Sequence, residues 1–182
     1  MLWALVMAGG PGTRLWPLSR RNRPKPLLSL LPGRASLLEE TVKRLHPLIS
    51  PAHVWVVGNA DHLKQLRTAL HHIPKAQIIG EPASRNTLAT VALGASLIAK
   101  KDPDAVVLVL PADHWIGDKP SFHKAIREAV QASRLTDSFA VFGVPAAFPS
   151  SSYGYLRSGR KISKSVYELV RFFFNTQFCN SI

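Results

Sequence analysis

Residues 2–15 read LWALVMAGGPGTRL, an apolar run that leads into a glycine-rich turn. The run at 2–7 predicts a buried strand, and the glycines at 9, 10 and 12 let the backbone turn sharply and approach a ligand, because no Cβ stands in the way. Successive N–H groups in such a turn form a concave anion site, and the planar guanidinium of Arg14 matches phosphate oxygens. The stretch therefore indicates a phosphate-binding turn after the first strand. An ordinary surface loop is the alternative.

Two common phosphate-binding motifs do not fit this turn. The P-loop requires a lysine directly after its second glycine, and no lysine stands at that spacing. The Rossmann dinucleotide motif requires a third glycine three positions after the second, where this chain has Leu15. The turn is thus predicted to hold phosphate in a different way.

Apolar runs alternate with helical patterns along most of the chain. Ser36 and Glu39 form a capping-box pattern that predicts a helix start. We expect strands at 2–7, 53–57, 77–79, 105–110 and 139–144, and helices at 36–45, 59–72, 86–101 and 121–133. This alternation predicts an α/β fold with a mostly parallel sheet. Ligands of such sheets bind beyond the carboxyl ends of the strands, so the glycine turn and Asp113 are expected to face one crevice.

Composition narrows the class of protein. A chain of 182 residues can bury one sizeable core. No apolar run reaches the roughly 18 residues of a membrane span, and the apolar start lacks the basic residues of a signal peptide. Cys179 is the single cysteine, which excludes an internal disulfide. We therefore expect a cytoplasmic protein with no membrane partner.

Positive charge is concentrated near the glycine turn. The formal net charge is +12, and no acidic residue precedes Glu39. The basic residues before it are Arg14, Arg20, Arg21, Arg23, Lys25 and Arg34. Such a cluster attracts a nucleoside triphosphate, although a solvated basic surface is also possible. An RNA-binding module would show aromatic residues interleaved with the arginines, and we find no such stripe, so we expect no nucleic-acid partner.

Several motifs resemble one known family. Residues 9–20 with Pro24-Lys25-Pro26 resemble the opening of sugar-nucleotide pyrophosphorylases, and residues 15–19 are most similar to the mannose-1-phosphate guanylyltransferase branch. Residues 81–87 are similar to the family's nucleotide-recognition segment, 110–114 to its metal-binding segment and 153–155 to the start of its sugar-binding part. The resemblance implies a three-layer, Rossmann-like nucleotide-diphospho-sugar transferase fold with a mostly parallel sheet.

The resemblance also implies a reaction and a set of roles. A sugar-1-phosphate oxygen attacks the α-phosphorus of GTP, giving GDP-mannose and pyrophosphate. Arg14 and Lys25 are the expected catalytic residues on the phosphates, Asp113 the ligand of Mg²⁺, and Gly154 the sugar-binding residue. The expected nucleotide-binding residues are Gly9, Gly10, Gly12, Thr13, Glu81, Arg85 and Asn86.

Plainer roles remain open for four of these residues. Arg14 could form a surface salt bridge, and Lys25 could be an exposed lysine in a stiff loop. Asp113 could be a loop or N-cap residue, and Asn86 a helix cap.

The resemblance ends near residue 173. We predict a nucleotidyltransferase domain at 1–173 and a divergent tail at 174–182, so that the fold is incomplete at its C-terminus. The family continues with a Glu-Lys-Pro segment whose lysine contacts the sugar phosphate, and this chain does not. We therefore expect GTP binding with little GDP-mannose synthesis. A non-catalytic nucleotide-binding or regulatory fragment is the alternative, and oligomerisation is left open.

Overall fold

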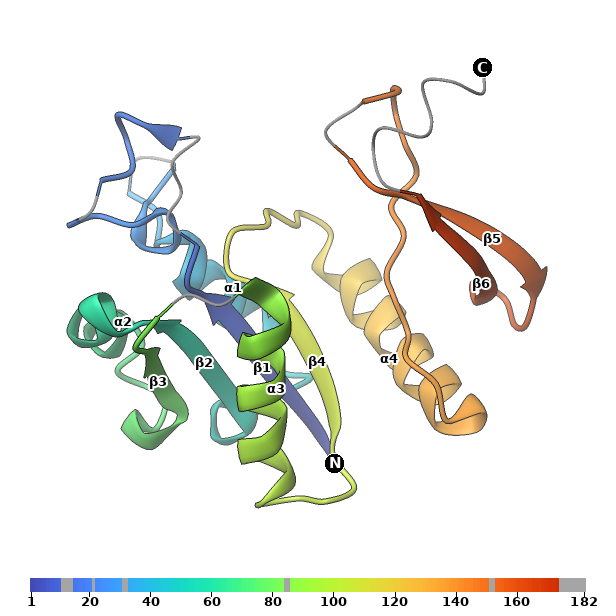
Figure 1. The fold of residues 1–182 in the computed structure, drawn as a ribbon, viewed down its shortest axis with the longest axis horizontal. Helices are drawn as coiled ribbons and strands as arrows, with labels where there is room; N and C mark the ends of the chain where they lie inside the picture. Colours follow the sequence, from blue (N-terminus) through green and yellow to red (C-terminus); the bar gives the residue numbers. More distant parts are fainter. Residues whose placement is uncertain (11–14, 21, 31–32, 84–85, 151–152, 174–182) are drawn as a thin grey trace. The chain divides into compact units, whose positions relative to one another are not determined.

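The computed structural model describes residues 1–10, 15–20, 22–30, 33–83, 86–150 and 153–173 (Figure 1). The chain divides into two compact units, Met1–His123 and Lys124–Ile182. The first unit contains a four-stranded sheet, and the second contains a two-stranded sheet.

The sheet of the first unit is parallel throughout. Its strands are β1 (Leu2–Ala8), β2 (Val54–Asn59), β3 (Ile78–Glu81) and β4 (Val106–Pro111), in the spatial order β3-β2-β1-β4. Each neighbouring pair runs parallel, and Val6 of β1 lies opposite Val56 on one side and Leu110 on the other. Because β1 is central and covered on both faces, its apolar run is continuous. The predicted α/β fold with a mostly parallel sheet is confirmed.

Helices cover both faces of this sheet. They are α1 (Leu37–Leu45), α2 (Leu63–Ala69) and α3 (Asn86–Ala99), and α4 (Lys119–Thr136) begins in the same unit. Helical crossovers join the parallel strands, with α1 between β1 and β2, α2 between β2 and β3, and α3 between β3 and β4. Figure 1 shows α3 crossing in front of β1. A Cβ at Gly94 of α3 would lie 2.4 Å from Leu5, whereas a Cβ at Gly58 would meet Leu66 of α2, so the expected three layers are present.

The sequence predicted the start of α1 correctly, but it predicted a longer helix than α2. Ser36 caps α1 with the predicted capping box, since its hydroxyl accepts from Glu39 N and the Glu39 carboxylate accepts from Ser36 N. The helix predicted at 59–72 is instead a 3-10 turn at Ala60–His62 followed by the short α2. Further 3-10 turns lie at Lys25–Leu27, Pro51–His53 and Lys75–Gln77.

The second unit contains β5 (Tyr155–Lys161) and β6 (Tyr167–Phe173), which pair antiparallel. The strand predicted at 139–144 is wrong, because this segment pairs with no strand in the part of the chain that the structure describes. Its apolar side chains are exposed, and Phe139 is fully so. An apolar run becomes a strand only where a neighbour satisfies its N–H and C=O groups. Among the described residues, no helix is long and apolar enough to cross a membrane.

Candidate functional site

The candidate site lies at the carboxyl edge of the four-stranded sheet. The strand order reverses between β1 and β4, since the chain leaves β1 toward β2 and returns to the other side of β1 as β4. In open α/β sheets, ligands bind at such a switch point. Gly9 and Gly10 directly follow β1, and Asp113 follows β4 by two residues. Gly9, Gly10 and Asp113 therefore lie at the same edge of the sheet, as their positions after β1 and β4 predicted.

Lys25 and Asp113 meet at this edge. The Lys25 Nζ donates to Asp113 Oδ2 at 2.6 Å, and both side chains are about one-third exposed, at 29% and 32%. Lys25 starts a 3-10 turn between Pro24 and Pro26, whose rings restrict the local backbone. The pair is short and charge-assisted, and it remains open enough to solvent for a ligand to reach both groups.

Gly9 and Glu81 also lie together, on the side of the edge toward β3. Glu81 ends β3 and is buried, with Oε1 accepting from Thr90 Oγ1 at 2.8 Å. A Cβ at Gly9 would lie 3.4 Å from Glu81 Oε2. A buried carboxylate needs a hydrogen-bond donor to offset its desolvation, and Thr90 Oγ1 supplies one to Glu81. Thr90 is thus a residue that motif reading missed, because its role depends on how α3 packs beside β3.

The structure describes some of the remaining predicted site residues and not others. Asn86 is exposed and opens α3 with a φ of 65°, a left-handed conformation that asparagine tolerates better than most residues. Gly154 belongs to the second unit, where a Cβ would lie 2.5 Å from the ring of Phe172, so its described contact is one of packing. Gly12, Thr13, Arg14 and Arg85 lie outside the described residues.

A polar network beneath the Asp113 loop was not predicted from the motifs. Arg44 of α1 is 7% exposed and donates from Nη1 to the His114 carbonyl at 3.1 Å and from Nη2 to Thr41 Oγ1 at 3.1 Å. Burial lowers the pKa of Arg44, and the Glu40 carboxylate acts against that shift. The sequence of α1 could have indicated that Thr41 and Arg44 are buried. At helical spacing, both lie on the same face as the buried Leu37 and Leu45.

Asp113 could hold a divalent cation only with outside ligands. Within the described ranges, no group of three or more His, Cys, Asp or Glu side chains could form a metal site. Mg²⁺ commonly binds through one or two carboxylates and completes its octahedral shell with waters and substrate phosphates. A single, partly exposed carboxylate such as that of Asp113 fits that pattern.

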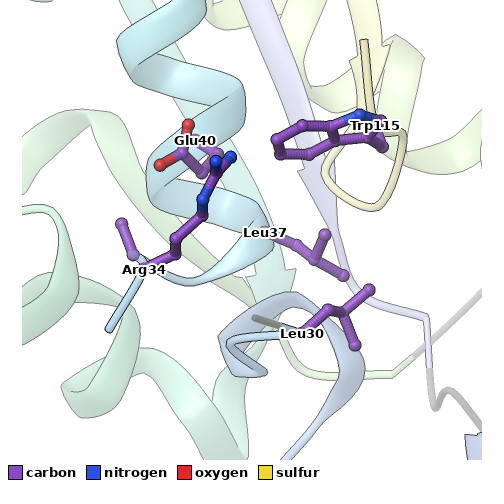
Figure 2. A pocket seen from close by; sticks show the side chains of 6 residues that line it. Leu30, Arg34, Leu37, Glu40 and Trp115 are labelled. Carbon is purple, nitrogen blue, oxygen red and sulfur yellow. The ribbon is translucent and has the colours of Figure 1, made fainter. Parts of the chain in front are cut away.

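A pocket of about 250 Å³ lies beside the start of α1 (Figure 2). Its walls are largely apolar, and Trp115 faces Leu30 and Leu37 across it, with Arg34 and Glu40 on another side. The Arg34 guanidinium lies 5.4 Å from the centre of the Trp115 ring. These walls are too apolar for a triphosphate, so we do not assign the pocket to the nucleotide.

Comparison with known proteins agrees with the fold and the motifs. Residues 3–172 match the model of the nucleotidyl transferase family. The chain therefore belongs to the nucleotidyl transferase family.

Within that family, the chain is similar to mannose-1-phosphate guanylyltransferases. The Escherichia coli enzyme of that name is 38% identical over 177 residues, which cover 94% of this chain and 37% of that protein. The alginate biosynthesis protein AlgA of Pseudomonas putida is 37% identical over 164 residues, which cover 88% of this chain and 33% of that protein. The chain thus spans about a third of the length of these relatives.

A solved structure shares the fold. The crystal structure of a Thermus thermophilus protein named as a mannose-1-phosphate geranyltransferase matches with a TM-score of 0.81 and 32% identity. The match covers 98% of this chain and 51% of that chain. The resemblance to the mannose-1-phosphate guanylyltransferase branch is confirmed.

Proposed function

We propose that this chain provides the nucleotide-binding part of a transferase that forms GDP-mannose and pyrophosphate from GTP and mannose-1-phosphate. The observation that carries the proposal is the Lys25–Asp113 ion pair at the edge of the sheet where Gly9 and Gly10 follow β1. It brings a cation for phosphate, a carboxylate for a metal and a glycine turn for close approach to one edge of the sheet. The names of the relatives support the choice of substrates.

In this proposal the protein contributes mainly position and charge. Lys25 binds a phosphate oxygen near the reacting centre, and Arg14 binds the outer phosphates and the departing pyrophosphate. Asp113 holds Mg²⁺, which when bound neutralises charge on the phosphates. Holding two anions in reacting geometry supplies much of the rate enhancement of such a transfer. Lys25 and Asp113 form an ion pair with each other in the free chain. That ion pair would break when Asp113 binds a metal and Lys25 binds a phosphate oxygen.

The base and the sugar are assigned to neighbouring groups. Glu81 accepts from the N1 and N2 donors of guanine, because a carboxylate offers only acceptors. Asn86 and Arg85 complete the contacts to the nucleotide, Gly10, Gly12 and Thr13 donate backbone N–H groups to phosphate, and Gly154 allows close approach of the sugar. We also propose that the protein is cytoplasmic and that residues 1–173 form its nucleotidyltransferase domain.

A nucleotide panel tests the proposal. Calorimetry of the 182-residue chain with GTP, ATP, UTP and CTP in the presence of Mg²⁺ should show the tightest binding for GTP. Equal affinities across the four would refute the guanine assignment. Direct measurement of GDP-mannose, after mixing the chain with GTP, Mg²⁺ and mannose-1-phosphate, then tests the transfer. Binding of GTP without product would favour a non-catalytic nucleotide-binding fragment.

A further inference from the structure

The loop that carries Asp113 is held from beneath by α1. The carbonyl of Ala112, one residue before Asp113, accepts from Thr41 Oγ1 at 3.4 Å. The carbonyl of His114, one residue after it, accepts from Arg44 Nη1 at 3.1 Å. Ala112 N also donates to the Met7 carbonyl at the end of β1. Both residues that flank the carboxylate are therefore tied to the sheet or to α1.

One guanidinium links the two contacts from α1. Arg44 Nη2 donates to Thr41 Oγ1, and the same hydroxyl donates onward to Ala112. Arg44 thus reaches one flanking carbonyl directly and the other through Thr41. The His123 ring bonds the Arg44 main-chain carbonyl at 2.7 Å, and the guanidinium lies 5.5 Å from the centre of the Phe122 ring. The planar fork is consequently held in one orientation.

Packing alone does not account for a charged residue at this place. Thr41 is fully buried, Arg44 is nearly so, and Arg44 Nε has no hydrogen-bond partner among the described residues. An apolar side chain of similar volume would fill the same stripe of α1 without the desolvation of a guanidinium. What an apolar side chain cannot supply is the pair of directed donors that hold the Asp113 loop.

We propose that Arg44 and Thr41 are positioning residues that set the Asp113 carboxylate in the geometry needed to bind a divalent cation. This inference rests on the proposed function, because it takes Asp113 as the metal ligand. Residues that orient a metal ligand through hydrogen bonds, without touching the metal, typically contribute about 10- to 100-fold to metal affinity. Neither Arg44 nor Thr41 touches the ligand in this account.

Manganese binding to the 182-residue chain tests the inference. Mn²⁺ is titrated by electron paramagnetic resonance in the presence of GTP, and GTP affinity without metal is measured by calorimetry. Arg44→Met should weaken Mn²⁺ binding by about 10-fold or more while leaving metal-free GTP affinity unchanged. Thr41→Val should weaken Mn²⁺ binding in the same direction, and Thr41→Ser, which keeps the hydroxyl, should restore it.

Arg67 provides a matched control. Its Nε is also buried without a described partner, and its Nη2 donates to the Ile78 carbonyl at 3.3 Å, at the start of β3 and away from the carboxyl edge. Arg67→Met should leave Mn²⁺ affinity at the wild-type value. An equal loss in Arg67→Met and Arg44→Met would overturn the inference, as would unchanged Mn²⁺ affinity in Arg44→Met.

Two further outcomes are distinguishable. If Arg44→Met does not fold, the Thr41→Val and Thr41→Ser pair decides, and equal Mn²⁺ affinity in these two variants counts against positioning. If the wild-type chain with GTP binds no Mn²⁺, the metal role of Asp113 in the proposed function fails, and the positioning role fails with it.

Discussion

Lys25 and Asp113, 88 positions apart in the sequence, form an ion pair of 2.6 Å between Nζ and Oδ2 where the strand order of the sheet reverses. Each group therefore screens the charge of the other in the free chain. A metal that binds Asp113 and a phosphate that binds Lys25 both compete with this pair. The relationship makes the affinities of the site for cation and anion interdependent.

Replacing Lys25 should move these two affinities in opposite directions. A pair about one-third exposed contributes no more than about 1 kcal/mol, so Lys25→Met should raise Mn²⁺ affinity in the absence of nucleotide by up to about fivefold. GTP affinity should fall by about tenfold or more, because a charged hydrogen bond to phosphate is lost. Calorimetry measures both values, and the exposed Lys64→Met serves as control. A joint fall, or no change in either affinity, would contradict the competition.

Removing the charge of Asp113 should uncouple nucleotide binding from the metal. Asp113→Asn keeps the shape of the side chain but removes the negative charge that a hard cation requires. We expect the GTP affinity of this variant to be nearly independent of Mg²⁺ concentration, whereas that of the wild type increases with Mg²⁺. The same Mg²⁺ response in both proteins would mean that Asp113 is not a metal ligand.

Arg14, which lies outside the described residues, is predicted to act on phosphate alone. Arg14→Ala should weaken GTP binding by about tenfold or more, because charge-assisted hydrogen bonds are lost, and should leave guanosine binding unchanged. Paired titrations with GTP and guanosine measure the difference. Unchanged GTP affinity in a variant with a wild-type circular dichroism spectrum would argue against the phosphate-binding turn.

Gly94 should resist replacement although it lies within a helix. Alanine would favour α3 by about 1 kcal/mol, but its Cβ would lie 2.4 Å from both Cδ atoms of the fully buried Leu5. Overpacking of this kind costs about 1–3 kcal/mol, so Gly94→Ala should lower the free energy of unfolding overall. Urea denaturation measures the change. Gly117→Ala, where a Cβ meets only Trp115 Nε1 at 3.9 Å, is the control and should be nearly neutral.

Asp102 should make stability dependent on pH in the acid range. Its Oδ2 accepts from Trp3 Nε1 at 2.9 Å and lies 3.1 Å from the Met1 ammonium. The Trp3 hydrogen bond, followed by the contact with the N-terminus, lowers the pKa of Asp102 below its ordinary value. Because the folded-state pKa is the lower one, the stabilisation is present above the unfolded-state pKa and is lost as pH falls through the folded-state pKa.

Asp102→Asn should therefore be less stable than the wild type at neutral pH and should approach it in strong acid. Urea midpoints at about pH 7 and about pH 2.5 measure this convergence. The exposed Asp104→Asn is the control. A constant difference between wild type and Asp102→Asn across the two pH values would contradict the assignment.

The sequence by itself determined the elements whose signals are local. The apolar run at 2–7 is β1, because a strand buried on both faces needs no polar alternation. The Ser36–Glu39 capping box starts α1, because its hydrogen bonds join residues three apart. The alternation of strands and helices restricted the fold to a parallel α/β sheet, and that topology placed the glycine turn and Asp113 at one edge.

Only the tertiary structure decided which side chains meet there. The Lys25–Asp113 pair, the Gly9–Glu81 approach and the reach of Arg44 to His114 join residues far apart in the chain. The packing of α1 against β1 and of η2 (Lys25–Leu27) against α1, together with the pairing of β1, β2 and β3, sets these distances. Local propensity does not encode them. The segment at 139–144 shows the same dependence, since its apolar residues suggest a strand but no described neighbour pairs with it. A strand is defined by hydrogen bonds to another segment, so tertiary pairing decides whether it forms.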